Sequence, residues 1–128
     1  MPSPIQNDSE TFRPTLLVID DEPSILYAFR KFFGEPDATL LTASTAAEGI
    51  ELAKRHRPDV IILDVHLPDD SGLNTFHHIH KLDARILVVF ITGHGTTDMA
   101  IEAIKHGAFD YLFKPLEFDA LCEVVDRA

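Results

Sequence analysis

The stretch LLVIDD, residues 16–21, decides the fold of this chain of 128 residues. Four consecutive apolar residues without polar alternation are typical of a parallel strand that is covered on both faces of its sheet. The run then ends abruptly in two aspartates. The same pattern recurs in VIILD, residues 60–64, which is the strongest strand signal in the sequence. We therefore expect a parallel sheet whose strands end in acidic residues.

Amphipathic segments separate the apolar runs, and this alternation repeats five times from Thr15 onward. Strands that alternate with helices are the signature of an α/β fold. Short connections between parallel strands require right-handed crossovers, so helices are expected on both faces of one five-stranded sheet. The strands are expected at residues 16–19, 38–42, 60–63, 86–91 and 111–113. Of the five expected helices, the first begins at Pro23 and the second follows a capping box formed by Thr45 and Glu48. The third helix carries Phe76, the fourth carries Ile104 and the last carries Leu121.

Composition and charge narrow the possible functions. Hydrophobic residues make up 45% of the chain and charged residues 25%, which is typical of a globular protein. We expect a flexible leader at 1–14 and one domain at 15–128. With 21 acidic and 11 basic residues, the domain would repel a nucleic-acid backbone. No apolar run has transmembrane length and no secretory signal is evident, so a cytoplasmic location without membrane contact is expected. The single cysteine, Cys122, is expected to be a buried core thiol.

Polar residues stand at the end of four expected strands: the pair Asp20-Asp21, then Asp64, Thr92 and Lys114. Because ligands bind at the carboxyl ends of the strands in open α/β sheets, we expect these side chains to meet at one edge. Three crowded carboxylates repel one another unless Mg²⁺ and an ammonium group share the cavity. The set suits phosphoryl transfer, with Asp64 as the nucleophile. Thr92 would hydrogen-bond a phosphoryl oxygen, and Lys114 would neutralise its charge.

From about residue 15 to the end, this ordered set resembles the response regulator receiver family of two-component systems. The stretches TGHGT (92–96) and AFDYL (108–112), followed by Lys114-Pro115, resemble in particular the nitrogen-regulator (NtrC) class. The resemblance implies a CheY-like, flavodoxin-like doubly wound sheet with strand order 2-1-3-4-5 and five helices. It implies phosphorylation by a sensor histidine kinase. It also implies control of transcription through a sigma-54-type effector outside this sequence.

The resemblance also implies roles for individual residues at the metal site. Asp21, Asp64 and the backbone carbonyl of His66 would contact Mg²⁺, and Asp20 would reach the ion largely through water. Lys114 would enter the pocket after a peptide bond to Pro115 that is often cis in the family.

A phosphorylation switch is implied for Thr92 and Tyr111, in which Thr92 moves toward the phosphoryl group and the aromatic ring turns inward behind it. The output face, which would carry a homodimer or a docked effector, would be formed by the helix at 100–108, the strand at 111–113 and the last helix. Such a domain is a signalling module and not an enzyme beyond its own phosphorylation and slow dephosphorylation.

Other interpretations of the same residues stay open at this point. Each aspartate could merely cap the helix that follows it. An unphosphorylated interaction module of the same fold is one alternative function. A Mg²⁺-dependent phosphohydrolase is another, although such enzymes place a second aspartate where this chain has His66.

The histidines divide into two groups. His77, His78 and His80 suggest a metal site, but a solvated helix face is the favoured interpretation because no cysteine or carboxylate completes a ligand set nearby. His66 and His94 flank the expected acceptor. We hypothesise that they make the lifetime of the phosphorylated form depend on pH near neutrality.

Overall fold

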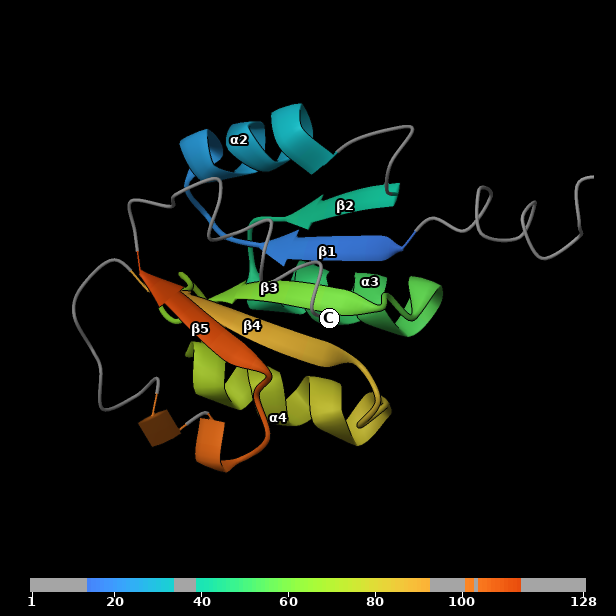
Figure 1. The fold of residues 1–128 in the computed structure, drawn as a ribbon, viewed down its shortest axis with the longest axis vertical. Helices are drawn as coiled ribbons and strands as arrows, with labels where there is room; N and C mark the ends of the chain where they lie inside the picture. The colour runs from blue at the N-terminus through green and yellow to red at the C-terminus, as the bar shows by residue number, and fades with distance from the viewer. Residues whose placement is uncertain (1–13, 34–38, 93–100, 103, 114–128) are drawn as a thin grey trace, which may run out of the picture.

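The computed structural model describes residues 14–33, 39–92, 101–102 and 104–113. Figure 1 shows the fold. Helical backbone at 101, 102, 104 and 105 corresponds to the fourth expected helix. The expected last helix, including Cys122, and the expected leader up to residue 13 lie outside the described residues. The elements are β1 (Thr15–Ile19), α2 (Pro23–Phe33), β2 (Thr39–Ala43), α3 (Ala46–His56), β3 (Val60–Asp64), α4 (Gly72–Leu82), β4 (Leu87–Thr92) and β5 (Asp110–Phe113).

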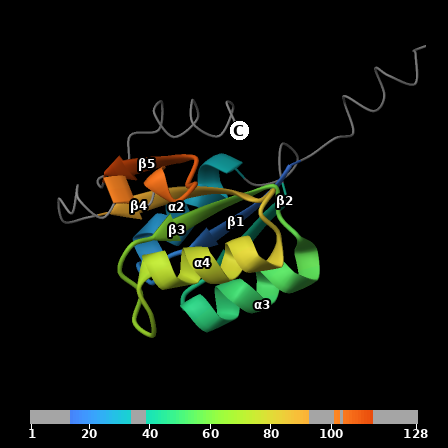
Figure 2. The same ribbon diagram turned by 90° about the horizontal axis from the view of Figure 1, so that it is seen from below.

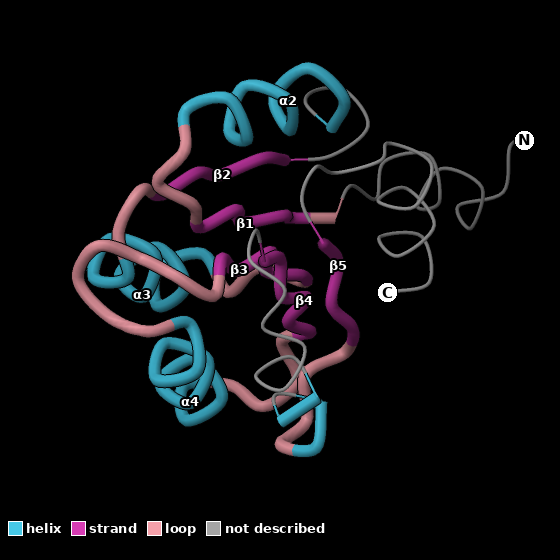
Figure 3. The backbone as a smooth tube through the Cα atoms, turned by 90° about the vertical axis from the view of Figure 1, so that its left-hand side faces the viewer, coloured by secondary structure: helices cyan, strands magenta, loops and turns pink. Residues whose placement is uncertain are grey.

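All five strands form one parallel sheet in the order β2-β1-β3-β4-β5. This confirms the predicted α/β class and the flavodoxin-like strand order. Helix α2 covers one face of the sheet, and α3 and α4 cover the other, as the view along the strands makes plain (Figure 3). Seen from below, α3 and α4 lie side by side (Figure 2).

The core consists of two apolar layers, one on each face of the sheet. Leu17 and Ile19 of β1 belong to the layer that contains Phe76 of α4. Val18 belongs to the opposite layer, which contains Phe29 of α2. All five side chains are fully buried, and burying an apolar side chain of this size stabilises the fold by roughly 1.5 to 3 kcal/mol. Since alternate residues of a strand face opposite ways, only an unbroken apolar run can fill both layers.

The capping box at the start of α3 is present with one difference from the expected form. The Thr45 hydroxyl accepts a hydrogen bond from the Glu48 backbone N–H at 3.1 Å. The Glu48 carboxylate reaches back to the N–H of Ser44 at 3.0 Å, one residue before the cap. Both bonds satisfy backbone donors that a helix start otherwise leaves without partners.

Three strands extend one residue beyond their expected ends, and β3 does so by including Asp64, which pairs with Ile91 of β4. Strand β2 includes Ala43, whose carbonyl accepts a hydrogen bond from the Asp20 N–H at 3.0 Å. Strand β4 includes Thr92, which pairs with Phe113 of β5. Partners on neighbouring strands, which local sequence does not show, therefore set these three ends. Among the described helices, none has the length and apolar composition needed to cross a membrane.

Candidate functional site

Three carboxylates meet where β1 and β3 end. Leu63 lies opposite Ile19 in the parallel register, so the next residues, Asp64 and Asp20, emerge from adjacent strands at the same edge. One oxygen of each of Asp20, Asp21 and Asp64 lies within 4.8 Å of the others. Asp20 is 0% exposed and Asp64 is 4% exposed, whereas Asp21 is exposed. The predicted convergence of these three residues is confirmed.

Short backbone turns orient the two buried carboxylates. One oxygen of Asp20 accepts the N–H of Glu22 at 2.9 Å. One oxygen of Asp64 accepts the N–H of His66 at 3.1 Å. A carboxylate that bonds the backbone two residues further on is typical of an Asx-turn, which holds the side chain beside its own strand end. The turns that follow β1 and β3 thus fix the orientation of both carboxylates.

The loop after Asp64 folds back on the end of its own strand. The N–H of Val65 still donates to Ile91 of β4 at 3.0 Å, and the N–H of Gly72 returns to the Val65 carbonyl at 2.7 Å. A Cβ at position 72 would lie 2.6 Å from the Asp64 carbonyl oxygen and 2.7 Å from the Val65 Cα, so only glycine fits here. His66, the fourth predicted ligand, lies in this loop with an exposed side chain.

The remaining predicted site residues belong to β4, β5 and the segment after them. Thr92 is the last residue of β4, one position beyond Ile91, which pairs with Asp64. Its side chain lies outside the described part of the structure, as do Lys114 and the bond to Pro115. Tyr111 pairs with Phe90 across β4 and β5, and its half-buried side chain packs against the core layer beneath α4.

The acidic cluster fits a hard divalent cation. Carboxylate oxygens are the ligands that Mg²⁺ prefers, and no nitrogen or sulfur donor of the softer metals belongs to the cluster. Within the described residues, this is also the one group of three acidic, histidine or cysteine side chains that converge closely enough to share an ion. A bound cation would offset the mutual repulsion of the three carboxylates.

The helical histidines lie apart from this cluster. His77 and His78 are exposed, as expected for a solvated helix face. His80 departs from that expectation in part, because it is half-buried and its ring lies at a tilt to the ring of Phe76, with centroids 4.3 Å apart. The ring of His77 lies edge-on to that of His106, at a centroid distance of 5.4 Å. The helical spacing of four residues accounts for the contact of His80 with Phe76, whereas the contact of His77 with His106 joins segments that are far apart in sequence.

Asp69 is a residue that the sequence analysis treated only as part of a loop. Its carboxylate oxygens accept the backbone N–H groups of Ala46 at 2.8 Å and Ala47 at 3.0 Å, at the start of α3. These hydrogen bonds, Ala46 first, hold the pKa of Asp69 below its usual range. The residues lie 23 and 22 positions apart, so no local pattern could have pointed to the contact.

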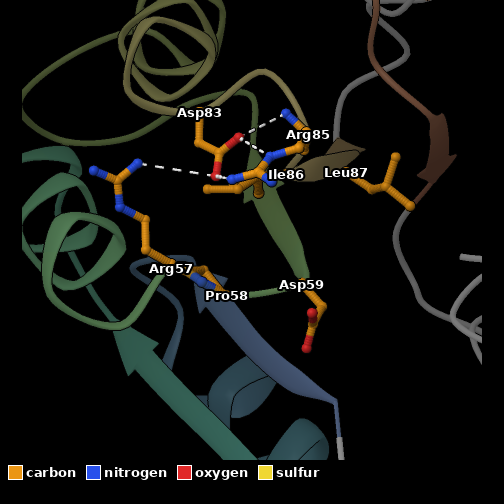
Figure 4. A pocket seen from close by; sticks show the side chains of 7 residues that line it. All are labelled: Arg57, Pro58, Asp59, Asp83, Arg85, Ile86 and Leu87. Carbon is orange, nitrogen blue, oxygen red and sulfur yellow. Dashed lines mark hydrogen bonds and ion pairs between the residues drawn. The ribbon is translucent and has the colours of Figure 1, made fainter.

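A separate open cavity of about 400 Å³ lies at the amino ends of β3 and β4, away from the acidic cluster (Figure 4). Asp83 receives two hydrogen bonds from the Arg85 side chain, at 3.0 and 3.2 Å, and lies 3.9 Å from Arg57. The Arg85 side chain, then its backbone N–H, lowers the pKa of Asp83. These charges are already matched to one another, so we do not assign a ligand to this cavity. The residues that line it are Arg57, Pro58, Asp59, Asp83, Arg85, Ile86 and Leu87.

Comparisons with known proteins agree with the fold and the acidic cluster. The response regulator receiver domain matches residues 16–126 of this chain. Regulatory protein LuxO of Vibrio cholerae is 34% identical over 111 residues, which are 87% of this chain and 24% of that protein. Response regulator protein PilR of Pseudomonas aeruginosa is 36% identical over 116 residues, 91% of this chain and 26% of that protein. The chain belongs to the response regulator receiver domain family.

A solved structure supports the same conclusion. The response regulator receiver domain protein from Clostridium thermocellum has a TM-score of 0.84 and 35% identity, over 89% of this chain and 92% of that one. The relatives bear out the resemblance to the nitrogen-regulator class. The chain spans about a quarter of the length of the curated relatives it matches.

Family membership establishes general properties of the domain. Receiver domains are signalling domains and not classical enzymes, and they interact with sensor histidine kinases. They bind Mg²⁺ at an acidic pocket, and the cluster of Asp20, Asp21 and Asp64 is consistent with such a pocket.

Proposed function

We propose that this domain accepts a phosphoryl group on Asp64 from a sensor histidine kinase and thereby switches an output surface. The observation that carries the proposal is the convergence of Asp20, Asp21 and Asp64 within 4.8 Å at the carboxyl end of a receiver sheet. Asp64 extends the central strand β3, whose two neighbours are β1 and β4. The choice of Asp64 as acceptor is supported by this strand order, because β3 lies between the strand that precedes Asp20 and Asp21 and the strand that ends at Thr92.

In the proposed reaction, a carboxylate oxygen of Asp64 attacks the phosphorus atom of the donor. A new P–O bond forms an acyl phosphate as the P–N bond to the donor histidine breaks, and the imidazole, which carries a proton on its other ring nitrogen, takes the electron pair of that bond and leaves as the neutral ring. Asp20, Asp21 and Asp64, with the His66 carbonyl, would hold Mg²⁺. When bound, the ion would neutralise charge on the phosphoryl oxygens. Thr92 and Lys114 would contact those oxygens directly.

The switch would run from the acceptor to β5 through neighbouring strands. A phosphoryl group adds roughly one to three charge-assisted hydrogen bonds, each worth about 1.5 to 3 kcal/mol. Two or three such bonds approach the roughly 5.5 kcal/mol needed to convert a mostly inactive population into a mostly active one. Because β4 pairs with β5, movement at Thr92 would reach Tyr111 two residues along the adjoining strand.

The output surface would include the helical segment next to β5. Ile101 is 44% exposed and Ile104 is 37% exposed, so this segment presents apolar side chains to solvent. Exposed apolar groups of this kind suit a homodimer contact or a docked effector. We infer that the domain acts in the cytoplasm within a larger regulator that controls transcription, through a sigma-54-type effector, and that it does not bind DNA itself.

Intact-mass measurement after incubation with acetyl phosphate and Mg²⁺ tests the proposal. Wild type should gain one phosphoryl increment that requires Mg²⁺, and Asp64→Ala should gain none. Asp59→Ala is the matched control, because Asp59 lies at the opposite end of β3 and should leave labelling unchanged. An unlabelled wild type, under conditions that label another receiver domain, would favour the interaction module. Phosphate release in large excess over protein would instead indicate a phosphohydrolase.

A further inference from the structure

Asp69 joins the loop that follows the acceptor strand to a helix on a different part of the chain. Both of its carboxylate oxygens accept backbone N–H groups, from Ala46 and Ala47, in the first turn of α3. Those N–H groups have no partner within the helix, and the helix dipole favours a negative charge there. The contact is therefore a tertiary one, made by a charged group to donors that need an acceptor.

The start of α3 does not depend on Asp69 alone for its capping. Thr45 already accepts the next N–H in the turn, from Glu48. The particular effect of Asp69 is to tie the loop at 65–71 to α3, across 22 and 23 residues of sequence.

This tie completes a second connection between β1 and β3, the strands that lead to Asp20 and Asp64. The N–H of Asp20 bonds the carbonyl of Ala43, and the chain then runs on through residues 44–46 into α3. Asp69 connects α3 to the loop, and the loop leads back through His66 to Asp64. The strands that carry Asp20 and Asp64 are thus linked twice, once through the sheet and once through Asp69.

We propose that Asp69 is a positioning residue for the metal site: it holds the loop against α3 and so keeps His66 and Asp64 set to bind Mg²⁺. The inference rests on the proposed function, since it concerns the same cation. Groups that orient metal ligands from outside the coordination shell change metal affinity by about 10- to 100-fold when removed. Because Asp69 acts through the loop, the lower end of that range, about tenfold, is expected.

Asp70 offers a matched control one residue away. Its carboxylate accepts the N–H of Ser71 at 2.8 Å and the side-chain amide of Asn74 at 3.2 Å, so its contacts stay within the loop and α4. Asp69→Asn and Asp70→Asn therefore remove the same charge from the same loop, but only the first weakens the tie to α3. Thr45→Ala is a second control, because it weakens the start of α3 and leaves the Asp69 side chain intact.

The test is the Mg²⁺ dissociation constant of each variant, measured by NMR titration without a phosphoryl donor. Asp69→Asn should weaken Mg²⁺ binding about tenfold. The two controls should stay within about twofold of wild type. In acetyl phosphate labelling, the same change should appear in the Mg²⁺ concentration needed for half the maximal rate, with the rate at saturating Mg²⁺ largely kept.

Two results would overturn the inference. One is an Asp69→Asn affinity equal to that of Asp70→Asn. The other is a loss of Mg²⁺ affinity in Thr45→Ala as large as that in Asp69→Asn, which would mean that general weakening of α3 explains the effect. A wild type that binds Mg²⁺ but is not labelled would contradict the proposed phosphoryl transfer alone, and the comparison of Mg²⁺ affinities would still decide the role of Asp69.

Discussion

Leu63 of β3 lies directly opposite Ile19 of β1, and both side chains are completely buried. This single pair sets the geometry of the acidic cluster, because the residue after each of them is an aspartate. A shift of one residue in the register would move one carboxylate away from the other and turn an apolar side chain out of its core layer. The packing of the core and the assembly of the site thus impose the same register.

Removal of one buried charge should stabilise the domain when Mg²⁺ is absent. The repulsion between two carboxylates within 4.8 Å is of the order of 3 kcal/mol at an effective dielectric constant of 20. We expect Asp64→Asn to raise the free energy of unfolding in a chelator by about 1 to 2 kcal/mol, after solvent screening. The amide keeps an oxygen to accept the His66 N–H. Urea unfolding of wild type and variant in a chelator provides the measurement.

The same variant should respond less to the cation. A ligand that binds only the folded state stabilises it by RT ln(1 + L/Kd), where L is the free ligand concentration, so weaker Mg²⁺ binding means a smaller rise in the free energy of unfolding at the same Mg²⁺ concentration. If Mg²⁺ stabilised Asp64→Asn and wild type equally, Asp64 would not be a ligand.

Gly72→Ala should disturb both the loop and the end of β3. The new Cβ would lie 2.6 Å from the Asp64 carbonyl oxygen, which is backbone and cannot rotate away. We expect a loss of about 1 to 3 kcal/mol in the free energy of unfolding, typical of overpacking. Asn74→Ala, at an exposed position of the same helix, is the control. Equal stability of the two variants in urea unfolding would show that α4 moves away from Asp64 without penalty.

Thr45→Ala should destabilise α3 at its first turn. The substitution removes the acceptor of the Glu48 N–H, which should lower the free energy of unfolding by about 1 kcal/mol. Thr45→Ser keeps the hydroxyl and should remain close to wild type in chemical denaturation. If the free energy of unfolding fell as far in the serine variant as in the alanine variant, loss of the methyl group and not loss of the cap would explain the result.

Asp83→Asn should change how stability depends on pH. The folded pKa of Asp83 lies below its ordinary value of 3.8, chiefly because of its hydrogen bonds from Arg85. The ionised carboxylate therefore contributes stability that is fully present above pH 3.8 and is lost as pH falls through the folded pKa. The variant should be less stable than wild type near neutral pH, and the difference should shrink in acid.

The partner of Asp83 provides the control for that experiment. In a protein that already carries Arg85→Met, Asp83→Asn should have a smaller effect, because the main cause of the lowered pKa is gone. Denaturation curves collected over a pH series for the four proteins of this cycle test the coupling. A gap between wild type and Asp83→Asn that stayed constant through acid pH would contradict the assignment.

Much of the site could be predicted because its residues stand in plain local patterns. Asp20 and Asp64 each follow an apolar run, and runs of that kind are buried parallel strands whose carboxyl ends meet. The cap at Thr45 could also be predicted, since a capping box spans only four residues. The bond from Glu48 to Ser44 in place of Thr45 depends on the path of the preceding turn, which the motif does not specify.

The amino-acid order alone determined the α/β class, the five strands and the aspartates at the ends of two of them, because hydrophobic period and turn residues are local properties of a chain. Only the tertiary structure decided which of those ends face one another and what holds them there. The register of Leu63 on Ile19 and the reach of Asp69 to Ala46 join segments that are far apart in sequence. Such contacts form only when the whole core closes, so they follow from packing and not from the spacing of residues along the chain.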